Sequence, residues 1–282
     1  YYRSGLDERN LFHTRRADRS LLYNLDHPDP ADPLHTFGVD DGTGYVDQRD
    51  NTYRFIATYF VYGQWKQHVL DGIRRLAAAY VVTGDSVYAH KAGILLDRVA
   101  DLYPTFNWPD QKGYVYGRRD YANGYVTVWH DSCQETLTLS MAYDRIFDAI
   151  KKDRELVSFL SKKAQEVGLE NSKQSFADIQ RNIEGRILRD ALTHTHKISC
   201  NYPYTDLTMN LMQAILEWPH NQHEIYAAID RTMQRVTAVD GVTGEKGLTQ
   251  YSAWPLTGWS VMLAEFDKID PVFLKNLYAR HP

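Results

Sequence analysis

The chain has 282 residues, a formal net charge of -4 and 24% charged residues. This composition is typical of a soluble globular protein with one large domain or two ordinary ones, and its charge argues against nucleic acid as a partner. No apolar run approaches the roughly 20 residues that a membrane-spanning helix needs. The 20 tyrosines and 6 tryptophans supply flat apolar faces with polar edges, which suit sugar rings as well as protein cores.

The first part of the chain, residues 1–52, is rich in Asp, Pro, Gly and His. We expect it to be an irregular segment with short helical pieces, packed on the rest of the protein. The chain begins with Tyr rather than Met, and no signal peptide is visible. We therefore expect a processed or excised piece of a longer protein.

From about residue 53 onward the pattern becomes helical. Apolar residues recur every three or four positions in 69–104, where TGDS at 83–86 separates two helices and Pro104 ends the second. The later helices are predicted at about 130–149, 153–168, 172–195, 203–217, 221–239, 255–267 and 271–280. The sequence therefore predicts an all-α fold of antiparallel helical hairpins over 53–282, either a solenoid or an (α/α) toroid. No fixed-period repeat is present, which weakens the solenoid interpretation.

Three loops between these helices carry the unusual residues: 105–128, 194–202 and 240–252. The first is long and crowded with Tyr, Gly and Arg, and loops of this length inside compact domains are usually functional. In a toroid, one end of the barrel collects such loops into a cleft. We expect a functional site there.

Tyr251 follows a loop with three glycines, DGVTGEKGLTQ, and stands directly before a predicted helix. A phenol with an ordinary pKa of about 10 is a ready proton donor. As a base it must first lose its proton, which costs roughly 3 pKa units or about 4 kcal/mol unless a cation offsets it. Tyr251 is thus either a catalytic phenol or a simple helix-starting residue after a linker that also carries Glu245.

His130 lies beside Trp129 at the start of another predicted helix. It is either a hydrogen-bonded, partly buried histidine or a general base and donor to a substrate carboxylate. Arg119 in the preceding loop, next to a second arginine, could bind a carboxylate or sulfate through its fork of donors. The alternative for Arg119 is a solvated loop charge.

Asn201 precedes an apolar helical run. Its side chain either stabilises the turn before the helix or contacts the substrate. His196, one of two histidines in THTHK (193–197), suits a cationic rim better than a metal site, because no third ligand has suitable spacing. We expect no cofactor. Cys133 and Cys200 allow one disulfide or none, and their spacing is not that of a metal site.

The order and spacing of several motifs resemble the N-terminal helical domain of the heparinase II/III-like polysaccharide lyases, a group that also resembles certain alginate lyases. The motifs are FGVDDGTGY, a helix with Trp65, LAAAYVVTGDSVYAHKAGILLDRVADLYP, MAYDRIFD, NIEGRILRDAL, SCNYPYTDLTMNLMQAIL and GEKGLTQYSAW. The resemblance covers about residues 36–265.

The resemblance implies an incomplete (α/α) toroid, which in that family is followed by β-sandwich domains, and we expect such a C-terminal domain in the full-length protein. It implies a periplasmic or secreted enzyme that cleaves a uronic-acid-containing glycan, such as a glycosaminoglycan or alginate, by β-elimination. Asn201 aligns with the family's Asn that contacts the uronate carboxylate, and Tyr251 aligns with its catalytic Tyr. We expect His130 to assist them, and the expected substrate-binding residues are Arg119, Trp129, Tyr125, Tyr204, Glu245 and His196.

The chain also departs from the family. Thr205 and Asp206 stand where members often carry a His, and the further His that the β-sandwich usually supplies is absent. The alternatives are therefore a glycan-binding toroid without catalysis and a glycoside hydrolase with two acids such as Asp41 and Glu245. The lyase hypothesis predicts that the Asn201 amide and the Tyr251 hydroxyl lie on the order of 5–8 Å apart.

Overall fold

The computed structural model describes residues 23–24, 26–36, 45–46, 49–50, 52–53, 65–106, 124–237 and 250–281. The regular secondary structure of the described part is helical except for a short antiparallel hairpin of β1 (Tyr45–Val46) and β2 (Thr52–Tyr53). Tyr45 pairs with Tyr53 and Val46 with Thr52. The predicted all-α class is confirmed for the described residues, while the hairpin was not predicted.

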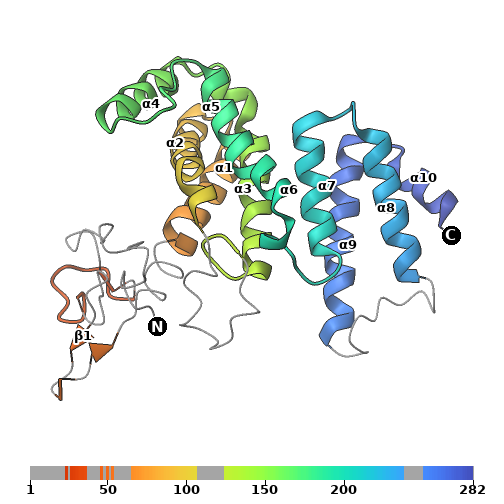
Figure 1. Cartoon of the computed structure of the whole chain (residues 1–282), viewed down its shortest axis with the longest axis horizontal. Coiled ribbons are helices and arrows are strands. Elements are labelled where there is room, and N and C mark those ends of the chain that lie inside the picture. Colours follow the sequence, from red (N-terminus) through yellow and green to blue (C-terminus); the bar gives the residue numbers. More distant parts are fainter. Residues whose placement is uncertain are drawn as a thin grey trace.

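The helices lie close to the predicted ranges (Figure 1). The α-helices are α1 (Asp71–Thr83), α2 (Ser86–Leu102), α3 (Trp129–Ile150), α4 (Arg154–Glu166), α5 (Phe176–Ile183), α6 (Asp190–Thr193), α7 (Tyr204–Glu217), α8 (Gln222–Thr237), α9 (Gln250–Ile269) and α10 (Phe273–Arg280). The shorter pieces are the 3-10 turns η3 (Tyr103–Thr105) and η7 (Thr195–Lys197), the π-helical turn η6 (Glu184–Arg189) and a further π-helical turn over 65–70.

Local capping chemistry sets several of these boundaries. Gly84 ends α1 with a left-handed φ of 71°, a conformation that glycine adopts without steric cost. Asp85 then begins α2 by accepting a hydrogen bond from the Val87 N–H at 3.0 Å. The predicted helix over 172–195 begins later, at Phe176, because Ser175 and Asp178 form a capping box.

The helices form a row of antiparallel hairpins rather than separate layers (Figure 1). α1, α2 and α3 pack against one another, α3 packs against α7, and α7 packs against α8 and α9. Among the described elements, no extensive contact joins α1 or α2 to α9 or α10. The described helices are therefore an open array, with α7 connecting its two halves.

Two hydrophobic cores share α7. Met212 belongs to the larger core with α1, α2, α3, α5 and η6, whereas Leu207 and Leu211 belong to the smaller core with α8, α9 and α10. Tyr204, at the first position of α7, packs against both. Because burial of apolar area is the main stabilising term, a change at the start of α7 affects both halves.

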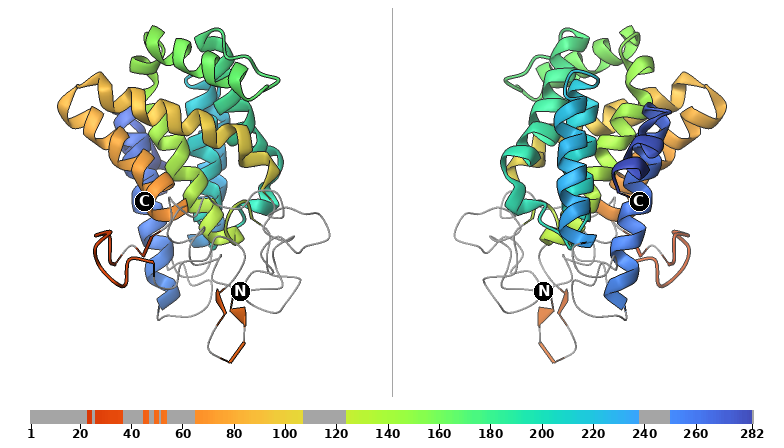
Figure 2. Two further views of the ribbon diagram at one scale, coloured as in Figure 1. Left: turned by 90° about the vertical axis from the view of Figure 1, so that its left-hand side faces the viewer. Right: turned by 90° about the vertical axis from the view of Figure 1, so that its right-hand side faces the viewer.

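One end of the array gathers the helix termini that flank the three unusual loops. The end of α2, the starts of α3, α7 and α9, and the end of α8 lie at this end in Figure 1, and Figure 2 shows the same arrangement from both sides. We call it the loop end. It carries the candidate residues at the starts of α3, α7 and α9.

Candidate functional site

Near the start of α3 lies a buried carboxyl group, Glu135. Its side chain is only 3% exposed. Oε2 accepts hydrogen bonds from the Trp65 indole N–H at 2.9 Å and from the Thr127 hydroxyl at 2.8 Å. Oε1 has no hydrogen bond in the described part of the chain, and Lys66 Nζ lies 3.9 Å from it. A buried carboxyl with one oxygen left unbonded is an unusual group in a folded protein.

The environment of Glu135 also changes its proton affinity. Burial raises its pKa to about 7, although the hydrogen bonds from Trp65 and Thr127 act in the opposite direction. The group therefore gains or loses a proton near neutral pH. Strongly shifted carboxyls of this kind occur in catalytic sites and also in structural networks of charges.

Ionisable side chains lie beside Glu135, at the very start of α3. Lys66 Nζ is 2.6 Å from Asp131 Oδ2, and His130 Nε2 is 3.5 Å from Asp131 Oδ1. The His130 side chain is 41% exposed, whereas its Nδ1 is buried, so solvent reaches part of the ring. Trp65 and Lys66 belong to a π-helical turn over residues 65–70, a local conformation that is frequent at functional sites.

Tyr125, which the sequence predicts to line a cleft, is instead part of the core. Its side chain is fully buried, and its hydroxyl donates to Asp190 Oδ2 at 2.6 Å. Its ring stacks on Tyr103 with centroids 4.2 Å apart, and Lys197 Nζ lies 4.5 Å from the ring centroid. No part of its surface is exposed in this structure, so the geometry here gives no support to the predicted sugar-stacking role.

The turn before α7 holds Asn201 without using its side chain. The Asn201 carbonyl accepts from the Tyr204 N–H at 2.9 Å, and the Tyr202–Pro203 peptide bond is cis. The Thr205 hydroxyl accepts from the Cys200 N–H at 2.7 Å. In the described part of the chain, the half-buried Asn201 amide makes no side-chain hydrogen bond. The helix entrance is therefore complete without it.

Pro203 was predicted in the first turn of this helix, but it is the N-cap residue and α7 begins at Tyr204. Its ring is buried against α9. A Cβ on Gly258 would lie 2.9 Å from both Cδ and Cγ of Pro203. Only a residue without a side chain allows this approach, so Gly258 brings α9 directly onto the entrance of α7.

Tyr251 was predicted to stand directly before a helix, but α9 begins at Gln250 and includes it. Pro255 lies inside this helix rather than at its start. Position 251 precedes Gly258 by seven residues, which is about two helical turns and about 10 Å along the axis. The two positions share one face of α9, so position 251 lies on the face that meets Pro203, nearer the loop end. The Tyr251 side chain is outside the described part.

The other predicted site residues fall into two groups. His196 is an exposed residue of η7, and its ring lies 6.0 Å from that of His194. Tyr204 is partly buried between the two cores. Arg119 and Glu245, and the side chain of Trp129, lie outside the described residues. The predicted distance between the Asn201 amide and the Tyr251 hydroxyl involves the Tyr251 side chain, which also lies outside the described part.

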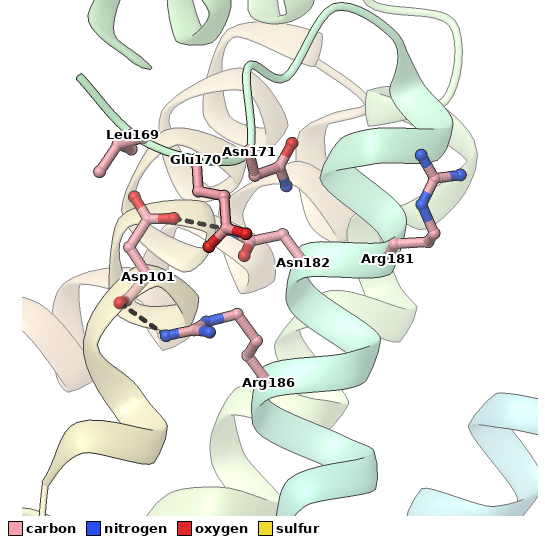
Figure 3. A pocket seen from close by; sticks show the side chains of 7 residues that line it. All are labelled: Asp101, Leu169, Glu170, Asn171, Arg181, Asn182 and Arg186. Atoms are coloured by element: carbon pink, nitrogen blue, oxygen red, sulfur yellow. Dashed lines mark hydrogen bonds between the residues drawn. The ribbon is translucent and has the colours of Figure 1, made fainter. Parts of the chain in front are cut away.

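A second polar cluster joins α2 to α5 and η6, and Figure 3 shows its Asp101, Asn182 and Arg186. Lys173 is 2% exposed and pairs with Asp97 and Asp101. Asn182 donates to the carboxylates of both at 2.9 Å. Arg186 donates to the carbonyl of Asp101 at 3.0 Å, near the C-terminus of α2.

An open pocket of about 420 Å³ lies beside this cluster. It is lined by Asp101, Leu169, Glu170, Asn171, Arg181, Asn182 and Arg186. The buried charges of the cluster are paired with each other, Lys173 with Asp97 and Asp101. Such pairing is typical of a structural network.

Two negative findings apply to the described ranges. No group of three or more His, Cys, Asp or Glu side chains is placed to hold a metal ion there. No helix in those ranges is both long and apolar enough to cross a membrane.

Glu135 and Lys66 were not predicted as site residues, and Trp65 was noted only as part of a motif. One local signal was present: Ser132, Thr136 and Ser140 recur every four residues in α3 and are all fully buried. A run of hydroxyl residues on a core face indicates a polar interior that can accommodate a carboxyl. The contacts themselves depend on Trp65, which is 70 residues from Glu135 in the sequence.

Comparison with known proteins gives no match. No family model, no curated protein and no solved structure matches this chain.

Proposed function

We propose that the chain is the helical domain of a polysaccharide lyase that cleaves an anionic, uronic-acid-containing glycan by β-elimination. In this proposal the row of hairpins is part of an incomplete (α/α) toroid, and a β-sandwich domain completes the full-length protein in the periplasm or outside the cell. The observation that carries the proposal is the contact of Gly258 with Pro203. It joins the helix of Tyr251 to the turn of Asn201, whose amide makes no side-chain hydrogen bond among the described residues.

The chemistry of β-elimination requires these residue types. The proton next to the uronate carboxylate is removed only when the negative charge that develops on the carboxylate is stabilised by hydrogen-bond donors. We assign this role to the Asn201 amide, with the accessible His130 ring in support. The phenol of Tyr251 then protonates the leaving oxygen of the glycosidic bond with its ordinary pKa, and serves as base if a cation lowers that pKa.

Substrate binding is assigned to residues around this centre. Arg119 provides a carboxylate or sulfate contact, Trp129 and Tyr204 provide apolar faces, and His196 belongs to the rim beside Asn201. Glu245 lies in the loop that precedes α9. The chemistry of elimination needs no cofactor in this scheme, since all groups that move protons are side chains.

The direct test is incubation with a panel of 4-linked uronate polymers, sulfated and unsulfated, followed by ultraviolet absorbance of the unsaturated product. The chain and a full-length protein with its C-terminal domain are assayed in parallel, with Tyr251→Phe as the control for chemistry. Unsaturated product that disappears in Tyr251→Phe supports the proposal. Saturated product identifies a hydrolase, and glycan binding without turnover by the full-length protein identifies a non-catalytic binding domain; both overturn it.

A further inference from the structure

The two cysteines of the chain meet beside the Asn201 turn. Cys133 is on α3, and its Sγ lies 3.2 Å from Thr208 Oγ1 and 3.5 Å from the Tyr204 carbonyl oxygen. Cys200 precedes α7, and its N–H donates to the Thr205 hydroxyl at 2.7 Å. Both cysteines therefore contact the first turns of α7, Cys133 through its thiol and Cys200 through its backbone. Neither forms a disulfide in this structure, and Cys200 packs against the core cluster that contains Cys133, whose thiol it influences as a hydrogen-bonding neighbour.

The two thiols differ in access to solvent. Cys133 is fully buried, whereas Cys200 is partly exposed. The contact with Cys200 and burial together raise the pKa of the Cys133 thiol, which makes Cys133 a poor first nucleophile. An oxidant from solution therefore reacts first at Cys200.

We propose that Cys133 and Cys200 form a reversible disulfide that links α3 to the turn of Asn201. The oxidant is a low-molecular-weight disulfide. Cys200 sulfur attacks one sulfur of the oxidant, an S–S bond forms, and one thiol leaves with the Cys200 proton. Cys133 sulfur then attacks Cys200 sulfur, and a second thiol leaves with the Cys133 proton. Two protein thiols lose two electrons, and the oxidant gains them.

The bond has a consequence for the candidate site, and this part rests on the proposed function. Cys200 is the neighbour of Asn201, and Cys133 lies one turn after His130 on α3. Forming an S–S bond draws the two sulfur atoms closer than their contact in the reduced protein, so the turn shifts toward α3. Because catalysis is sensitive to displacements of about 1 Å, we expect turnover to fall roughly tenfold or more in the oxidised form.

The test treats the full chain with oxidised glutathione and then counts thiols by alkylation in denaturant with mass spectrometry. The expected result is a monomer that has lost two hydrogens, with no alkylated cysteine and with the peptides of Cys133 and Cys200 joined. Its melting temperature should rise by about 5 °C or more over the reduced protein, and dithiothreitol should reverse both changes.

The variants separate the two steps. Cys133→Ala should retain one glutathione on Cys200, whereas Cys200→Ser should remain unmodified. Glutathione that stays on Cys200 in the unmutated protein, a dimer linked between chains, or two thiols that still react would each overturn the proposal. Equal turnover before and after oxidation would overturn the link to the site. A disulfide in a protein without lyase activity would leave this proposal standing and remove the proposed function.

Discussion

Gly258 in α9 lies against the ring of Pro203, so close that a Cβ at position 258 would be 2.9 Å from two ring carbons. This contact brings the helix that contains Tyr251 onto the turn that contains Asn201. The pyrrolidine ring cannot rotate away as a flexible side chain could, and Pro203 is itself buried. The spacing between α7 and α9 at this end therefore depends on a missing side chain.

We predict that Gly258→Ala destabilises the protein by about 1–3 kcal/mol, because the added methyl group overpacks the contact with Pro203. Lyase turnover should fall further than stability explains, since α9 carries Tyr251. Urea unfolding and the product assay measure the two effects. Gly72→Ala in α1 is the matched control: nothing lies within 4 Å of its Cβ position, so it should be neutral or stabilising by up to about 1 kcal/mol. Equal stability of the two variants would contradict the prediction.

Replacement of Asn201 by Ala should separate function from folding. Its side chain makes no hydrogen bond in the described part of the chain, so unfolding should change by less than about 0.5 kcal/mol. Turnover of a uronate polymer should fall about 100-fold to 1000-fold, the typical effect of removing a donor from a developing oxyanion. Thr205→Val is the comparison in the same turn. It removes the bonded hydroxyl and should destabilise by about 1–3 kcal/mol. A stability loss in Asn201→Ala as large as that of Thr205→Val would return Asn201 to a structural role.

The sequence predicted those elements whose signals are local. The break between α1 and α2 was correct because Gly84 adopts a left-handed conformation and Asp85 caps the next helix, and both effects act within a few residues. Pro255 misled the prediction for α9. It suits a first turn, but here the helix extends five residues before it, at the loss of one backbone hydrogen bond.

The candidate site was less predictable because its contacts join distant segments. Tyr125 in a Tyr-rich loop resembled a cleft residue, yet its hydroxyl is bonded to Asp190, which lies 65 residues away. Glu135 has no neighbour in sequence that marks it, and its burial depends on Trp65 and Thr127. Periodicity predicts which face of a helix is buried, but it does not predict the partner of a buried polar group.

Lys173 provides a test of the polar cluster beside α2. We predict that Lys173→Met costs about 3–5 kcal/mol, because it leaves the buried carboxylates of Asp97 and Asp101 without their cation. The left-handed backbone at 173, with φ of 52°, is equally strained for both side chains and so does not enter the difference. Lys163→Met is the control. It removes an exposed pair with Glu166 and should cost less than about 1 kcal/mol. Similar losses in the two variants would show that the cluster contributes little.

Glu135 should give the folded protein a characteristic pH dependence. Its pKa is about 7 in the folded state, against an ordinary value of 4.5. Between these values the folded state binds more protons than the unfolded state, so stability falls as pH rises through this window. The contribution is full below about pH 4.5 and is lost above about pH 7, a change of about 3 kcal/mol.

Glu135→Gln should remove this contribution while keeping the shape of the side chain. The variant should be less sensitive to pH than the unmutated protein, and the difference in unfolding free energy between them should change by about 3 kcal/mol from pH 4.5 to pH 8. Urea unfolding at several pH values measures it. Asp97 and Asp144, whose pKa values are also raised by burial, titrate in both proteins and cancel in the difference. Glu155→Gln at an exposed position of α4 should run parallel to the unmutated protein. A parallel curve for Glu135→Gln would mean that Glu135 keeps its charge in the folded state, with Lys66 compensating it.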